Sequence, residues 1–354
     1  MKHAVAILFL TAAIAEAQQP PRELQPIPAL FPAGETSLAD ILAALKQTGN
    51  VVTDRRQPAK PVQLTLPMKM GDFWPTLDTV GEKTGIAFSA YQPDGGVALV
   101  DRPYRQLPTS YSGVFRFAVK RVNVTRNDET QTRLCTVTLD VAWEPRFQPF
   151  YLNLAGASAK FAPDTKGNSL NESIPRQARG SVAGATATEI ELSMKAPERS
   201  SPALAALTGS IEVVGPPRML DFAFTKLAPI KKDAQVLKQD GVEVRLVYAE
   251  LGKTRWSVDL DLADPDGVRM LESFQADAWR ANNRIWLSWG EHQLEPTGGY
   301  AEKSKVGTRI RAIFEAKGDT PLPPRGAEVT LRYRTPNRVA AFVAPFAFRD
   351  LPLP

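Results

Sequence analysis

Histidine and cysteine are the scarcest of the residues that could carry chemistry in this chain. The 354 residues contain two histidines and one cysteine, and His3 lies in a stretch expected to be removed on export. A Ser-His-Asp or Cys-His arrangement would therefore have to use His292, which follows Glu291 in a polar turn, a position typical of a solvated side chain. One histidine and Cys135 cannot fill the tetrahedral shell of a zinc site. We therefore predict no catalytic residue, no metal and no cofactor.

Four aspartates form an acidic cluster: Asp259, Asp261, Asp264 and Asp266. Carboxylate oxygens are calcium ligands, but the spacing does not match an EF-hand loop and no glutamate stands at its closing position. Asp259 and Asp261 fall on the wet face of an expected strand, and D-P-D-G is a common turn sequence. A turn is the favoured interpretation, with cation binding left open. No pair of carboxylates is singled out for glycoside hydrolysis.

Trp286 is the one candidate binding residue. Tryptophans gather in the last third of the chain, at Trp256, Trp279, Trp286 and Trp289. In the run from Ile285 to Trp289, alternation places Trp289 on the apolar face and Trp286 on the other. An exposed tryptophan could stack on a sugar ring or anchor a partner. The favoured alternative is that Trp286 is covered by a neighbouring loop or domain and Trp289 belongs to the core.

The elements that must position these residues are mainly β-strands. The clearest pair is Val114–Arg126 and Arg133–Trp143, joined by a polar turn. Inward positions of the second strand are apolar and include Cys135, which is expected to act as a small hydrophobe. The first strand changes phase at Lys120–Arg121, which predicts a β-bulge.

Part of this pattern returns about 120 residues later. Gly113-Val114 corresponds to Gly241-Val242, and an F-A-F-x-x-L run recurs at 222–227 and 346–351, with Pro and Arg upstream of each. The sequence predicts either two diverged copies of one β-domain or two unrelated β-domains.

The expected organisation is multi-domain and mainly β. Short strands punctuated by turns predict two immunoglobulin-like β-sandwiches, and helix–strand–strand patterns predict a small α+β unit before them. The expected segments are a signal peptide at 1–17, a Pro-rich linker at 18–36, the α+β module at 37–101, a linker at 102–112, and β-sandwiches at 113–229 and 241–354.

Residues 37–101 carry a resemblance to a known family. The runs are L-A-A-L-K-Q-T-G-N-V-V-T-D, V-Q-L-T-L, F-W-P-T-L-D-T-V-G-E-K-T-G-I-A-F-S and G-V-A-L-V. This pattern of apolar positions resembles the short N-terminal domain shared by secretins and TonB-dependent receptors. The resemblance implies a periplasmic protein-interaction module without catalysis. It covers about a fifth of the chain, and here two β-domains take the place of that family's membrane domain.

Charge and hydropathy restrict the function further. The net charge is +5 and stays +5 without residues 1–17, because Lys2 and Glu16 leave together. Basic residues are dispersed, so a nucleic-acid partner is not expected. No run after the signal approaches the ~18 apolar residues of a transmembrane helix. The sequence thus favours an exported (periplasmic or extracellular), non-catalytic binding or structural protein of the cell envelope that acts through protein–protein contacts. The alternative is a carbohydrate-binding or carbohydrate-processing protein that uses the second sandwich.

Overall fold

A computed structural model of the chain describes residues 20–32, 34–67, 69–92, 95–182, 184–225, 227, 235–263, 283–303, 307–316, 321–324 and 326–354. The expected signal peptide and Trp279 lie outside these residues. The protein is mainly β, with several sheets and two α-helices among the described residues. Neither helix is long and apolar enough to cross a bilayer.

The first part of the chain is a small α+β unit, here called the N-module (residues 20–107). Helix α1 (Leu38–Gln47) begins at Ser37, whose Oγ accepts a hydrogen bond from the Asp40 amide at 3.1 Å, as expected of a capping residue. Helix α2 (Phe73–Thr84) ends at Gly85, where a φ of +72° favours glycine. Its N-cap, Asp72, makes no side-chain capping bond.

Three small sheets accompany these helices. The largest has the order β3-β7-β6, in which β3 and β7 are parallel, and the others pair β1 with β5 and β2 with β4. The strands are β1 (Ala29–Leu30), β2 (Glu35–Ser37), β3 (Val52–Asp54), β4 (Gln63–Thr65), β5 (Met70–Gly71), β6 (Ile86–Ser89) and β7 (Val97–Pro103). Residues 18–36 were expected to be only a linker. Instead, a short 3-10 helix, η1 (Arg22–Leu24), and strands β1 and β2 build part of this segment into the fold, because Leu24, Ala29 and Phe31 are buried.

Next comes the first β-body, in which two sheets enclose one apolar core. One sheet has the order β14-β10-β9-β8, and the other has the order β12-β11-β15-β25, with β13 also pairing with β11. The strands are β8 (Thr109–Ser112), β9 (Phe115–Asn127), β10 (Thr132–Trp143), β11 (Tyr151–Phe161), β12 (Asn171–Ile174), β13 (Gln177–Ser181), β14 (Ala187–Lys195), β15 (Ala203–Gly215) and β25 (Ala340–Pro352). The predicted bulge is confirmed, because the β9–β10 register shifts between Thr138 and Leu139.

The second β-body has the same plan of two sheets over one core. Its sheets have the orders β17-β18-β19-β23-β22 and β16-β24-β20-β21. The strands are β16 (Met219–Phe224), β17 (Gln235–Gln239), β18 (Val242–Leu251), β19 (Arg255–Ala263), β20 (Arg284–Trp289), β21 (His292–Leu294), β22 (Gly298–Lys303), β23 (Gly307–Glu315) and β24 (Thr330–Pro336).

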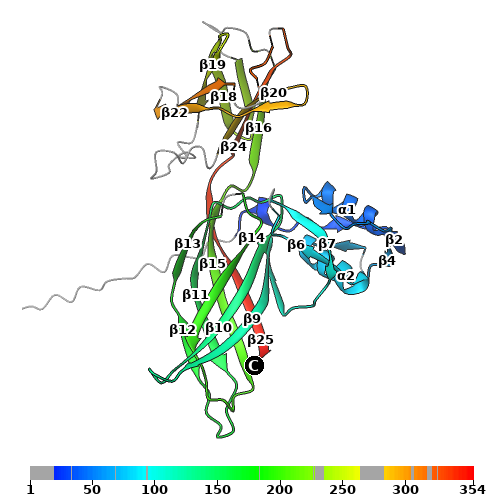
Figure 1. The fold of residues 1–354 in the computed structure, drawn as a ribbon, viewed down its shortest axis with the longest axis vertical. Helices are drawn as coiled ribbons and strands as arrows, with labels where there is room; N and C mark the ends of the chain where they lie inside the picture. The colour runs from blue at the N-terminus through cyan, green and yellow to red at the C-terminus, as the bar shows by residue number, and fades with distance from the viewer. Residues whose placement is uncertain are drawn as a thin grey trace, which may run out of the picture.

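The expected boundaries of the two β-domains are wrong at three strands. Strand β16 was assigned to the first domain but pairs with β24 of the second body. Strand β25 was assigned to the second domain but pairs with β15 of the first body over twelve residue pairs. Figure 1 shows β25, in red, running from the upper body down into the lower one. Strand β8, expected within a linker, forms the edge of the first body.

The two bodies are joined by two chain segments that run side by side. The Asn337 amide donates to the Arg218 carbonyl at 2.9 Å, and the Arg218 amide donates to Asn337 Oδ1 at 3.2 Å. Arg338 forms an ion pair with Glu23 at 3.0 Å. This connection, here called the hinge, therefore consists of two hydrogen-bonded segments held against the N-module.

Candidate functional site

The residues that could have formed a nucleophilic site lie apart. His292 is exposed at the start of β21 and stacks on Trp289, with ring centroids 5.4 Å apart. Cys135 lies in the core of the first body and is fully buried. Because the two residues belong to different bodies, the structure does not bring them together.

Cys135 should be unreactive in the folded protein. Burial raises the pKa of its thiol to about 11, so the thiolate, which is the reactive form, is scarce near neutral pH. We expect no reaction with a thiol reagent at pH 8 in buffer and complete reaction of the one thiol in concentrated urea. Stoichiometric labelling of native protein within minutes would contradict this.

The acidic cluster is used in ion pairs. Asp259 and Asp261 are 3% and 5% exposed, and each accepts two hydrogen bonds from an arginine of β23, Arg311 and Arg309 respectively. The pair of Asp261 has N–O distances of 2.7 and 2.9 Å. The expected wet face is therefore an outer face covered by guanidinium groups. Asp264 and Asp266 lie outside the described residues. Within the described part of the chain, no three potential metal ligands gather.

Trp286 is covered. It is 8% exposed, it lies outside the core cluster of the second body, and the Arg284 guanidinium lies 4.6 Å from its ring centroid. Trp289 is a core residue of the same body. An indole face stacked under arginine is not open to a sugar ring, so the feature that favoured carbohydrate binding is missing at Trp286.

A buried polar cluster that the sequence did not predict joins the N-module to the first β-body. Asp78 of α2 is 6% exposed and accepts four hydrogen bonds. Arg116 of β9 donates two, from Nε at 2.8 Å and Nη2 at 2.9 Å. The hydroxyls of Tyr104 and Tyr111 donate the others, at 2.8 and 2.6 Å. Burial and these bonds to a carboxylate raise the pKa of both phenols, which therefore stay protonated as donors.

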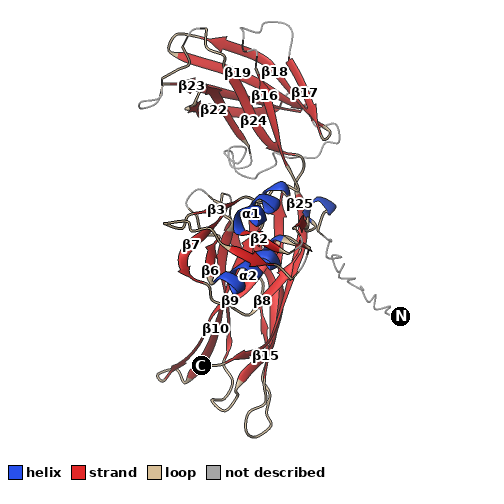
Figure 2. Cartoon of the chain, turned by 90° about the vertical axis from the view of Figure 1, so that its right-hand side faces the viewer, coloured by secondary structure: helices blue, strands red, loops and turns tan. Residues whose placement is uncertain are grey.

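Further contacts join the N-module to the first body near the Asp78 cluster. The Trp74 indole donates to the Val114 carbonyl at 3.0 Å, and the Arg116 guanidinium lies 5.2 Å from the Phe88 ring centroid. Ala142 and Ala187 of the first body belong to the core of the N-module. Figure 2 shows both helices lying against the side of this body. All four hydrogen bonds that Asp78 accepts come from other residues of this chain, so the cluster bonds the N-module to the first body.

Glu144 is a second buried carboxylate at the same interface. It is 1% exposed, accepts a hydrogen bond from Asn50 Nδ2 at 2.9 Å, and pairs with Arg146. Arg146 also donates to the carbonyls of Glu23 and Gln25 at 2.8 and 2.7 Å. Burial raises the pKa of Glu144 above its usual range, although Arg146 and Asn50 act in the opposite direction.

This raised pKa predicts a pH effect with a definite sign. A carboxyl with a higher pKa in the folded state binds more protons there, so its contribution to stability is lost as pH rises above about 4.5. Relative to the wild type, Glu144→Gln should therefore become more stable as pH rises from 4 to 7, because the amide stays neutral. Urea unfolding of both proteins at each pH checks this. A relative stability that falls with rising pH would contradict it.

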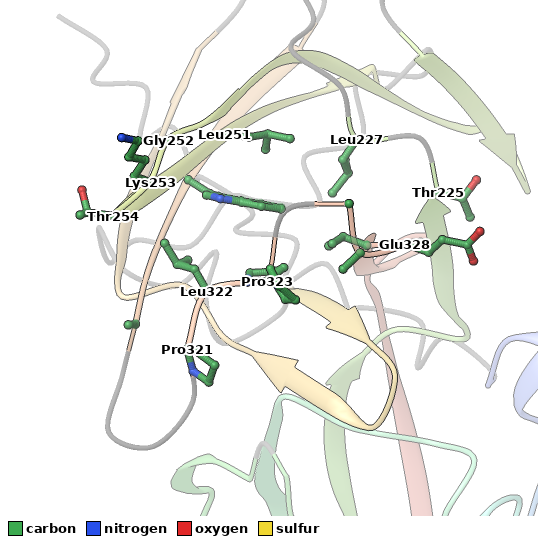
Figure 3. Close-up of a pocket in the computed structure, with 16 residues that line it drawn as sticks. Thr225, Leu227, Leu251, Gly252, Lys253, Thr254, Pro321, Leu322, Pro323 and Glu328 are labelled. Carbon is green, nitrogen blue, oxygen red and sulfur yellow. The ribbon is translucent and has the colours of Figure 1, made fainter.

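The second β-body contains an open pocket of about 890 Å³ whose lining is mixed and more apolar than polar. It lies at the end of β16 that faces away from the hinge. Its apolar lining comes from the segments after β16, between β18 and β19, and before β24, and includes Leu227, Leu251, Trp256, Leu322, Pro323 and Val329. Figure 3 shows Leu227, Leu251, Leu322 and Pro323 around one central space, with Lys253 and Glu328 on opposite sides of it.

The chemistry of this pocket is that of a binding site. Trp256 and Val329 belong to the core of the body, so the pocket floor is continuous with a packed interior. Pro321, Pro323 and Pro324 lie in its wall and have no amide hydrogen, so this wall offers carbonyl acceptors and apolar rings but few donors. An apolar centre with a few polar groups at the edge is the usual lining of a ligand pocket. Sequence analysis missed it because most of its residues come from loops without periodicity.

Comparisons with known proteins leave the chain without a family. No protein-family model matches it, and no curated protein matches it. Among solved structures, the chain is similar to one titled "The crystal structure of the conserved domain protein from Bacillus anthracis", with 9% sequence identity, over 70% of this chain and 90% of that chain. The TM-score is 0.18, so this likeness carries no argument about fold or function.

Proposed function

We propose that the protein is an exported, non-catalytic protein of the cell envelope that binds another protein through the pocket of the second β-body. The single observation that carries this proposal is the pocket itself, a space of about 890 Å³ with leucines and prolines around its centre and charged groups on opposite sides. Export is proposed from the signal-like pattern of residues 1–17.

A protein segment is the occupant that suits this pocket. Protein-binding surfaces have an apolar centre, where a few side chains give most of the binding energy, and a polar rim. Here Leu227, Leu251 and Leu322 are half-buried around the centre, while Lys253 and Glu328 lie exposed on opposite sides. Opposite charges at the two sides would favour one direction of an extended segment that inserts apolar side chains between them.

We propose that the N-module has the role that its resemblance to the secretin and TonB-dependent receptor domain implies, an interaction unit of the envelope. We also propose that the two β-bodies are immunoglobulin-like. The Asp78 cluster supports a rigid arrangement of the N-module, because a buried ion pair with two further hydrogen bonds to its carboxylate fixes the two surfaces that carry it.

A pocket variant with a matched control tests the proposal. Leu322→Asp places a charge in the pocket, whereas Val236→Asp places one on an exposed strand position of the same body, where the valine is 44% exposed. We expect the apolar dye 1-anilinonaphthalene-8-sulfonate to bind the wild type and Val236→Asp with the same affinity. Its affinity for Leu322→Asp should be at least about tenfold lower.

The same three proteins can be cross-linked in an envelope extract and their captured partners compared. The wild type and Val236→Asp should capture the same partner, and Leu322→Asp should not capture it. Equal capture by all three proteins, or turnover of a substrate by the purified chain, would overturn the proposal. Carbohydrate binding is not proposed, because Trp286 is covered by Arg284.

A further inference from the structure

The two β-bodies share one strand plan. In the first body β9, β10 and β14 are neighbours, and in the second β18, β19 and β23 are neighbours in the same order. The facing sheets correspond as β12-β11-β15-β25 and β21-β20-β24-β16. The bulge is also shared, because the register shifts opposite Thr138/Leu139 in one body and opposite Asp259/Leu260 in the other, positions 121 residues apart.

The correspondence holds for the two strands that cross the hinge. Phe222 of β16 pairs with Tyr333, and Phe346 of β25 pairs with Gly209. Adding 124 to Phe222 gives Phe346, and adding 124 to Gly209 gives Tyr333. Strands β16 and β25 are therefore equivalent, in equivalent register, yet each lies in the body built by the other half of the chain.

We infer that the bodies are two copies of one domain that have exchanged their last strands within the chain, and that the folded second body holds the first body closed. The second body is continuous from Met219 to Pro336, and these two residues are paired with each other. While the second body is folded, it holds the two hinge segments together. Gly215 and Ala340, the first β15–β25 pair beyond the hinge, are therefore already close to each other.

The coupling is one of loop entropy. If the second body unfolds, β25 can pair with β15 only by closing a flexible loop of about 120 residues. The entropy lost in closing such a loop lowers the equilibrium constant for folding of the first body by a factor on the order of a thousand. The open state of the first body should then be more populated by the same factor, although none of the contacts within this body has changed.

Hydrogen exchange of the β10 amides in the full chain measures this opening, because β10 lies in the middle of the first body. Leu260→Asp buries a charge at a fully buried core position and unfolds the second body. We expect β10 exchange to accelerate by a hundredfold to about a thousandfold. Val236→Asp, on the exposed face of β17, should leave it unchanged.

A disulfide across the hinge separates loop closure from every other effect. Arg218 and Asn337 are hydrogen-bonded neighbours on the two segments, so Arg218→Cys with Asn337→Cys places two cysteines at bridging distance. In the Leu260→Asp protein, the oxidised pair should restore β10 exchange to within about tenfold of the wild type, and reduction should remove the protection again. In the wild-type background the bridge should change little.

Two results would overturn the inference. In the first, the β10 amides of Leu260→Asp exchange at the wild-type rate although loss of the tryptophan signal of the second body shows that this body is unfolded. The two bodies would then be independent. A first body that stays unprotected in the oxidised Leu260→Asp protein would mean that contacts or misfolding, and not loop closure, link the two.

Discussion

Asp78→Ala should destabilise the protein by about 3–5 kcal/mol in urea unfolding, the range found when one member of a buried ion pair is removed. The side chains of Asp78 and Arg116 are 8% and 5% exposed, so the substitution would leave a buried guanidinium without a counter-charge. It would also remove the acceptor of two phenol hydroxyls. The first loss should be the packing of α2 against the first body, measured as faster hydrogen exchange in α2.

Glu82→Ala is the matched control for this prediction. Glu82 lies one turn further along α2, is exposed, and accepts only a hydrogen bond from Gln106 at 2.9 Å. Its replacement should cost less than about 0.5 kcal/mol, as for most exposed positions. Equal effects of the two substitutions would show that the Asp78 cluster does not hold the interface.

Removal of residues 340–354 should abolish folding of the first β-body. The deletion takes away the partner of β15 over twelve residue pairs and five buried side chains, those of Phe342, Ala344, Phe346, Phe348 and Leu351. At about 1.5–3 kcal/mol for each large apolar side chain, the loss is about 10 kcal/mol, comparable with the whole stability of a domain. The single thiol, Cys135, should then react in buffer without urea.

A shorter deletion gives the control. Removing only Leu353 and Pro354, which follow β25, should leave Cys135 protected, because every pair with β15 remains. The second body should survive the long deletion, since all of its described strands lie between Met219 and Pro336. Retention of a protected Cys135 after the long deletion would contradict the observed strand pairing.

Local features of the fold could be predicted because they depend on neighbouring residues. The Ser37 cap, the glycine end of α2 and the bulge in β9 each follow from a few consecutive residues. Strand partnership could not, because alternation tells which face of a strand is buried but not which sheet it joins. The F-A-F-x-x-L runs of β16 and β25 fit equivalent places in both bodies, so the sequence alone assigned each strand to the wrong one.

The interface and the pocket were missed for different physical reasons. An aspartate in an amphipathic helix normally faces water, and the partners of Asp78 at Tyr104, Tyr111 and Arg116 lie 26 to 38 residues away in the chain. The pocket is assembled from the β18–β19 hairpin and two loop segments, and the apolar residues of those loops follow no period. Trp286, which did stand out, is aromatic on an outer strand face, and only the position of Arg284 shows that it is covered.

The late position of β25 in the chain also sets an order of assembly during synthesis. A ribosome delivers β8 to β15 first, but the sheet that contains β15 lacks its edge strand until residues 340–352 appear. The segment from Met219 to Pro336 emerges whole in the meantime and contains all the strands described for the second body. The first body therefore cannot complete its sheet until after the second body has been synthesised. During this interval the unpaired edge of β15 is open to a chaperone or to a neighbouring nascent chain.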